Sequence, residues 1–218
     1  MKALIVGSSG GIGSALVRAL SDHDVHTVSR SQNGLDLEKP ETLPNVLANV
    51  PSELDLIINA TGVLGLDGHD PERRLQAIEA DVMARLFAIN SIGPALLLKH
   101  LQPKLKRRGR SVFANLSARL GSIGDNGLGG WTSYRASKAA LNQIVRCAAI
   151  EIRRKRPESV VVSLHPGTIE TDLTRPYARG RYTATTDEAA RQLLDVLASL
   201  TPEDSGGFFD YAGKAIPF

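Results

Sequence analysis

The chain has 218 residues, of which 42% are hydrophobic and 22% are charged, and its formal net charge is +3. This composition is typical of a globular protein and excludes a disordered chain, a collagen-like chain and a disulfide scaffold. The basic clusters lack the interleaved aromatic side chains of a nucleic-acid stacking surface. No uncharged apolar run approaches about 18 residues, and the N-terminal apolar stretch is too short for a signal peptide. We therefore expect a soluble, cytoplasmic protein that binds neither nucleic acid nor a membrane.

Predicted strands and helices alternate along the chain. Residues 1–6 form an apolar strand pattern, and Ile12, Leu16 and Leu20 then repeat at helical spacing. Further strands are predicted at 25–28, 54–60, 111–116, 160–164 and 207–211, and further helices at 71–108 (bent or divided at Pro94), 133–154 and 187–200. Continuous apolar strands alternating with helices predict an α/β fold, namely a Rossmann-type doubly wound parallel sheet of about seven strands with helices on both faces.

Two features qualify this pattern. The segment between Arg30 and Asp36 is short, so the helix expected between the second and third strands is missing or vestigial. The single cysteine, Cys147, lies in an apolar helical pattern that predicts a buried and unreactive thiol. Because no stretch resembles a linker, we expect residues 1–218 to form one domain.

A glycine-rich turn follows the first strand and opens the first helix. In a doubly wound fold a dinucleotide binds here, because glycines let the backbone approach the pyrophosphate and the helix N-terminus offers free N–H groups. The spacing is G-x-x-x-G-x-G rather than G-x-G-x-x-G, so a tight turn without a ligand is the alternative. We favour a dinucleotide site that includes Gly7, Ser8, Ser9, Gly11, Ile12 and Gly13.

The residues before and after the second strand indicate whether the cofactor is NAD(H) or NADP(H). NAD-specific sites carry a carboxylate after this strand, whereas an arginine there can accept the 2′-phosphate of NADP. Asp22 and Asp24 precede the strand, and Ser29-Arg30 follows it. The sequence therefore favours NADP(H) over NAD(H), with an ordinary exposed arginine as the alternative for Arg30.

A tyrosine and a lysine four residues apart, Tyr134 and Lys138, lie on one face of a predicted helix. A neighbouring cation stabilises a phenolate and shifts its pKa towards a value useful for proton transfer. Ser117 ends a predicted strand upstream, and Asn90 lies in the preceding helix. This set indicates acid–base chemistry.

In these motifs the chain resembles the short-chain dehydrogenase/reductase family over nearly its whole length. The resemblance rests on the glycine turn, Asn59-Ala60-Thr61-Gly62, Asn90, the set of Ser117, Tyr134 and Lys138, and His165-Pro166-Gly167-Thr168. Within the family, residues 121–131 and 134–142 are most similar to the C-factor-like carbonyl reductases.

The resemblance implies roles for individual residues. Tyr134 would be the general acid/base, and Ser117 would hydrogen-bond the substrate oxygen. Lys138 would hold the nicotinamide ribose and lower the pKa of Tyr134, and Asn90 would anchor a proton-relay water. The resemblance implies no metal, and it implies cofactor contacts from Arg30, Asp36, Leu37, Asn59, Ala60, Thr61, Gly62, Tyr134, Lys138, Pro166, Gly167, Thr168, Ile169 and Thr171.

The chain departs from the family pattern in three places, one of which is the short segment after Arg30, beside the expected adenine-side pocket. Ser117 and Tyr134 are 17 residues apart, a longer separation than is usual, so a loop is enlarged and Ser122 rivals Ser117 for the serine role. The segment after Asp172 is short and contains Tyr177 and Tyr182, which predicts a small substrate lid. Simple packing is the alternative for these tyrosines and for Trp131.

Two functions follow from this sequence. The first is an NADP(H)-dependent oxidoreductase that interconverts a carbonyl and a secondary alcohol of a small molecule; the alternative is a non-catalytic dinucleotide-binding or cell-signalling protein on the same fold. The helix at 134–154 is apolar over more than one stripe. We therefore expect a homodimer or homotetramer in which helices 90–107 and 134–154 pair across subunits.

Overall fold

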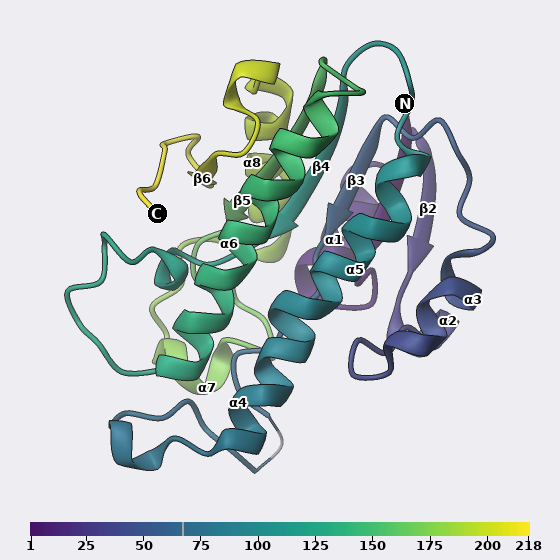
Figure 1. Ribbon diagram of the computed structural model, residues 1–218. Coiled ribbons are helices and arrows are strands. Elements are labelled where there is room, and N and C mark those ends of the chain that lie inside the picture. The colour runs from purple at the N-terminus through teal and green to yellow at the C-terminus, as the bar shows by residue number, and fades with distance from the viewer. Residues whose placement is uncertain (67) are drawn as a thin grey trace.

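The computed structural model describes residues 1–66 and 68–218. In this part of the chain a parallel sheet has six strands in the order β2-β1-β3-β4-β5-β6 (Figure 1). The strands are β1 Lys2–Val6, β2 Asp24–Val28, β3 Leu56–Asn59, β4 Ser111–Leu116, β5 Ser159–His165 and β6 Phe208–Asp210. The predicted fold class is confirmed. The predicted count of about seven strands is too high, because the chain turns at Gly213 after β6 and Ala215 makes only an isolated antiparallel bridge with Phe209.

Helices cover both faces of the sheet. They are α1 Gly11–Ala19, α2 Arg30–Asn33, α3 Leu43–Leu47, α4 Ala80–Phe87, α5 Gly93–Leu101, α6 Thr132–Arg153, α7 Arg175–Ala178 and α8 Thr186–Ser199. One face packs against α3, α5 and α6, and the other packs against α1 and α8. Two short helices, α2 and α3, replace one long helix between β2 and β3, as the short segment after Arg30 predicted.

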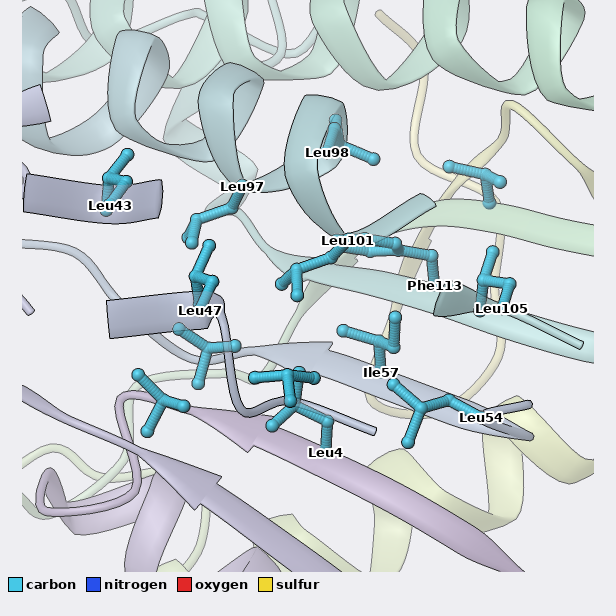
Figure 2. Close-up of a cluster of buried hydrophobic side chains, with 14 of the residues drawn as sticks. Leu4, Leu43, Leu47, Leu54, Ile57, Leu97, Leu98, Leu101, Leu105 and Phe113 are labelled. Carbon is cyan, nitrogen blue, oxygen red and sulfur yellow. The ribbon is translucent and has the colours of Figure 1, made fainter. Parts of the chain in front are cut away.

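The core beneath α5 shows why the strands are continuously apolar. Leu4, Ile57 and Phe113 share one register across β1, β3 and β4 and point towards α5 (Figure 2). Their neighbours along each strand point to the opposite face, against α1 and α8. Because both faces are covered, every strand position needs a side chain that tolerates burial.

The helical segment at 71–108 differs from its prediction. Regular helix begins only at Ala80, and a π turn over Ala88–Ile92 separates α4 from α5. Pro94 has no N–H to donate to the carbonyl four residues earlier, at Asn90, so the helix changes its hydrogen-bond pattern directly before this proline. Residues 71–79 form a loop with one 3-10 turn at Leu75–Ala77.

One helical run of the described chain, Ala80–Lys104, is long and apolar enough to cross a membrane by length and composition. The mean hydropathy of its most apolar window is 1.3, and 39% of that window is buried. Part of this apolar character comes from core residues of the domain. Leu97, Leu98 and Leu101 pack into the core above the sheet (Figure 2).

Cys147 is exposed, so its predicted burial is wrong. The buried stripe of α6 runs through Leu141, Val145, Ala149 and Ile152, which leaves Cys147 on the outer face of the helix. Its sulfur accepts a hydrogen bond from Gln143 Nε2 at 3.4 Å.

Candidate active site

The site lies at the carboxyl ends of the strands, where β1 has β2 on one side and β3 on the other. The chain passes from β1 to β2 on one side and then crosses from β2 to β3 on the other side of β1, so the strand order reverses at β1. Ligands of doubly wound folds bind outside the carboxyl ends of the strands at such a reversal. The turn after β1, the loop after β3 and the end of β4 all lie at this end of the sheet.

The glycine turn after β1 leaves no room for side chains. Gly7 has a φ of +83°, and a Cβ on Gly13 would lie 2.1 Å from the Gly7 carbonyl oxygen. A Cβ on Gly11 would lie 2.6 Å from Thr171 Cγ2. The exposed N-terminus of α1 has no acidic side chain in its first turn. These features fit a dinucleotide, because backbone N–H groups and a positive helix end can approach the pyrophosphate without obstruction.

Two further segments that the sequence predicts to contact a cofactor meet this turn. The 166–171 segment reaches it through Thr171, and Thr168 is held by hydrogen bonds with Thr183. After β3, the Asn59 side chain accepts hydrogen bonds from the N–H and hydroxyl of Thr61. Gly62 follows, and a Cβ there would lie 3.1 Å from Lys138 Nζ and 3.2 Å from Asn90 Oδ1. The loop therefore connects the glycine turn with the predicted catalytic residues.

The predicted adenine-side residues lie farther along the same edge. Arg30 is exposed at the first position of α2, and Ser8 Oγ lies 3.5 Å from Gln32 Oε1 in that helix. Asp36 accepts a hydrogen bond from the Glu38 N–H. Leu37 is 8% exposed and packs against Gly93 at the start of α5, so its side chain belongs to the core.

Tyr134 and Lys138 lie in the first turns of α6 and are both buried. Lys138 Nζ donates a hydrogen bond to the Leu116 carbonyl at 3.0 Å, at the end of β4. Tyr134 belongs to a small buried cluster with Leu64 and Ala118, and Ala118 directly follows Ser117 in the sequence. The tyrosine and the lysine therefore both lie near residues that flank Ser117 in the sequence.

The two rival serines have different surroundings. Ser117 Oγ is buried and has no hydrogen-bond partner among the described residues. Ser122 Oγ donates to the Pro217 carbonyl and accepts from the Asp125 N–H at 3.1 Å. Ser122 thus ties the enlarged loop to the C-terminal segment, and Ser117 is the hydroxyl that remains available.

Asn90 lies in the π turn between α4 and α5 and is fully buried. Its side chain accepts from the Val63 N–H at 2.9 Å and donates to the Val63 carbonyl at 2.9 Å. Asn90 Nδ2 also lies 3.2 Å from Ser137 Oγ in α6. The asparagine therefore fixes the loop after β3 against the two helices that border the site.

Burial dominates the electrostatics of the pair on α6. It raises the pKa of the Tyr134 phenol well above its ordinary value. It lowers the pKa of the Lys138 ammonium to about 8, because desolvation penalises the charged form of each group. The lowering of the Tyr134 pKa expected from its cationic neighbour is thus outweighed in the protein alone.

Two polar residues beside the site were not singled out from the sequence. Asn115 in β4 is fully buried and accepts a hydrogen bond from Asn59 Nδ2 at 3.0 Å. Ser137 Oγ donates to the Tyr134 carbonyl at 2.8 Å and joins that residue to Asn90. An asparagine within an apolar strand was the available signal for Asn115, but its pairing with Asn59 depends on strand register.

Comparisons with known proteins agree with this arrangement. A family model for short chain dehydrogenases matches residues 33–181. The C-signal protein of Myxococcus xanthus is 38% identical over 166 residues, which make up 76% of this chain and 93% of that protein. The 1-hydroxy-2-glutathionyl-2-methyl-3-butene dehydrogenase of Rhodococcus sp. (strain AD45) is 28% identical over an alignment of 222 positions that covers 94% of each chain.

Solved structures share the fold over the whole chain. The carbonyl reductase Sniffer of D. melanogaster superposes with a TM-score of 0.84 at 22% identity and covers 100% of this chain and 99% of its own. An NADPH-bound carbonyl reductase from chicken fatty liver has a TM-score of 0.82 at 26% identity, with 100% and 98% covered. The family match over most of the chain, together with this fold, places the protein in the short-chain dehydrogenase family of oxidoreductases.

Proposed function

We propose that the protein is an NADP(H)-dependent oxidoreductase that interconverts a carbonyl group and a secondary alcohol of a small molecule, with residues 1–218 forming one dinucleotide-binding domain. The observation that carries the proposal is the buried group of Ser117, Tyr134 and Lys138 beside the glycine turn. Buried polar groups require polar partners, and Ser117 Oγ has none among the described residues. A substrate oxygen has the right chemistry to be that partner.

Each residue has a distinct task in carbonyl reduction. NADP(H), held at the glycine turn, would supply the hydride that the carbonyl carbon accepts. Tyr134 donates its phenolic proton to the carbonyl oxygen, so that hydride and proton together convert C=O into CH–OH. Ser117 holds the same oxygen by a hydrogen bond and stabilises the negative charge that develops on it.

The pKa shifts of the α6 pair suit this direction of reaction. Because burial raises the pKa of Tyr134, the phenol is protonated at neutral pH, as a proton donor must be, although it is a weaker acid than a free tyrosine. Lys138, with a pKa of about 8, is mostly protonated at pH 7 and stabilises the phenolate that remains after transfer. Lys138 would also hold the ribose of the cofactor, and Asn90 would anchor a relay water.

The preference for NADP(H) rests on the two ends of β2. Asp24 begins this strand and Asp22 precedes it, so both carboxylates lie at the edge away from the site. Arg30 lies at the carboxyl end, where a guanidinium can bind a phosphate through two hydrogen bonds. The NADPH-bound chicken carbonyl reductase supports this choice.

A panel of aldehydes and ketones tests the proposal directly. Purified protein is incubated with NADPH, and in parallel with NADH, and oxidation of the nicotinamide is followed by absorbance. We expect consumption of NADPH with at least one carbonyl and slower consumption of NADH. Absence of turnover with either cofactor across the panel would contradict the enzymatic assignment.

Similarity to C-signal favours a second candidate, a dinucleotide-binding signalling protein without turnover. Both candidates require NADP(H) to bind, so calorimetric titration with NADPH accompanies the panel. Binding without any carbonyl-dependent oxidation supports the signalling candidate, whereas turnover supports the oxidoreductase.

A further inference from the structure

A groove of about 480 Å³ lies beside the first turn of α6, where Arg135 lines it. Its walls combine apolar and aromatic side chains with three arginines, and they include Arg73, Leu120, Leu128, Trp131, Arg135, Pro176, Tyr177 and Arg179. The loop before α4, the loop leading into α6, and α7 supply these residues, and Figure 1 shows the three segments at one end of the molecule. Leu120, Trp131 and Tyr177 also pack against the buried cluster of Leu64, Ala118 and Tyr134. The groove and the proposed proton donor therefore share this wall of side chains.

We propose that this groove is the substrate-binding site and that it selects carbonyl compounds bearing an anionic group, a carboxylate or a phosphate, attached to a flat apolar portion. This inference rests on the proposed oxidoreductase function. The carbonyl end of such a substrate lies towards Tyr134, the flat portion lies against the aromatic wall, and the anion lies among the arginines.

The aromatic wall is held rigidly. The rings of Trp131 and Tyr177 meet edge to face, with centroids 5.7 Å apart. Trp131 has a φ of +52°, an unfavourable backbone conformation for a bulky residue. The backbone N–H of Trp131 donates to the backbone carbonyl of Glu72 at 2.6 Å. This bond anchors the conformation of Trp131 to the loop before α4. A preformed aromatic wall binds a flat substrate without a large ordering cost.

Among the described residues, none of the three arginines of the groove, Arg73, Arg135 and Arg179, has an ion-pair partner. No carboxylate is among the described residues that line the groove. The two carboxylates nearest in sequence have other partners. Asp70 accepts a hydrogen bond from the Tyr177 hydroxyl at 2.9 Å, and Glu72 accepts from the N–H and hydroxyl of Ser133.

Arg135 is the most constrained of the three arginines. Its Nε donates to the Gly130 carbonyl at 2.9 Å, and its partial burial lowers its pKa from the usual value, although an arginine remains charged at neutral pH. A partly desolvated cation in a concave site attracts an anion more strongly than an exposed one does. An anionic substrate supplies the charge that the protein lacks here.

A matched pair of ketones tests the charge preference. The ketones 4-acetylbenzoate and 4-acetylbenzamide have nearly the same shape, but only the first is an anion. We expect the wild-type protein to reduce the benzoate with the higher kcat/KM. In the double variant Arg73→Gln/Arg179→Gln this preference should fall roughly tenfold or more, because charge-assisted hydrogen bonds are lost.

The control is the double variant Arg74→Gln/Arg181→Gln. It removes the same number of charges from neighbouring positions that are not among the described lining residues. Its benzoate preference should stay within about twofold of the wild type. Equal kcat/KM values for the two ketones in the wild type, or an unchanged preference in the groove variant, would overturn the proposal.

A binding measurement separates this inference from the proposed function. Trp131 is the only tryptophan of the chain and lines the groove, so its fluorescence reports ligands there even if no ketone is reduced. The concentration of 4-acetylbenzoate that saturates the signal should be roughly tenfold lower than that of 4-acetylbenzamide. Equal saturation would contradict the anion site, whereas absence of turnover with anion-selective binding would contradict only the proposed reaction. A third ligand, 4-acetylphenyl phosphate, shows which anion the arginines bind more tightly, and it too should saturate the signal at a lower concentration than the amide.

Discussion

Tyr134 and Lys138 lie one helical turn apart, and burial shifts the pKa values of both side chains. Spacing of four residues brings the two side chains to one face of α6, and burial then disfavours the charged form of both. The result is a phenol that keeps its proton and an ammonium whose pKa is about 8. This pair is suited to donating a proton to a developing alkoxide.

Tyr134→Phe removes the phenolic hydroxyl and keeps the ring that packs against Ala118. We expect kcat to fall by roughly 10² or more, because general acid catalysis supplies a factor of about 10² to 10⁴. Steady-state kinetics on an accepted ketone gives kcat, and calorimetry should give an almost unchanged Kd for NADPH. Turnover close to that of the wild type would contradict the role of Tyr134.

Ser117→Ala and Ser122→Ala distinguish the two serines. Ser117→Ala should lower kcat/KM by roughly 10² and leave the thermal midpoint nearly unchanged, because no described residue bonds to its hydroxyl. Ser122→Ala should lower stability by about 1 kcal/mol or more, because the Pro217 carbonyl and Asp125 N–H lose a partner. Greater loss of activity from the Ser122 change would show that the wrong serine was chosen.

At the scale of single elements, interruptions of regular structure lie next to the proposed chemistry. The π turn at Ala88–Ile92 contains Asn90, and the short α2 directly after β2 begins with Arg30. Both segments carry a polar residue that the sequence places in the proposed site. π turns are frequently found at functional sites.

Arg30→Asp tests the element that follows β2. The substitution replaces a phosphate partner with a like charge, so Kd for NADPH should rise roughly tenfold or more while Kd for NADH changes little. Isothermal titration with each cofactor gives the ratio of the two constants. Arg108→Asp, which makes the same charge change at an exposed position after α5, is the control. An equal ratio of the two dissociation constants in the variant and the wild type would show that Arg30 is an ordinary surface residue that does not bind the phosphate.

At the scale of the whole molecule, the predicted pairing of α5 and α6 across subunits remains a prediction. Ile92 and Ile150 are large apolar side chains on these segments that are about half exposed, at 52% and 51%. Ala149 is 3% exposed and packs in the core, as Ala148 does in part, so neither is a clean probe of an interface.

Ile150→Glu tests the assembly. Light scattering at micromolar concentration should show a dimer or tetramer for the wild type and a 23.4 kDa monomer for the variant, because a buried unpaired charge opposes association. Leu75→Glu, at a 71% exposed position of the loop before α4, is the control and should leave the oligomer intact. A wild-type particle of monomer mass would refute the assembly itself.

The sequence by itself determined the sheet-and-helix order, the glycine turn and the catalytic candidates, because these depend on periodicity and on spacing within a single segment. Tyr134 and Lys138 lie on one helical face because they are four residues apart. The bounds of β2 place Asp22 and Asp24 before or at its start and Arg30 after its end. The boundary at Ala80 was missed, because the residues before it have helical spacing without a helical partner to pack against.

Only the tertiary structure decided which of these residues remain available for chemistry. The Ser122 hydroxyl donates a hydrogen bond to the Pro217 carbonyl, 95 residues farther along the chain. The side-chain amide of Asn59 in β3 donates to that of Asn115 in the neighbouring strand β4. The outward position of Cys147 depends on which face of α6 meets the sheet. The arginine-lined groove is assembled from three segments that are distant in the chain. Burial, hydrogen-bond competition and concave shape arise from contacts between such segments, so no pattern within a single segment contains them.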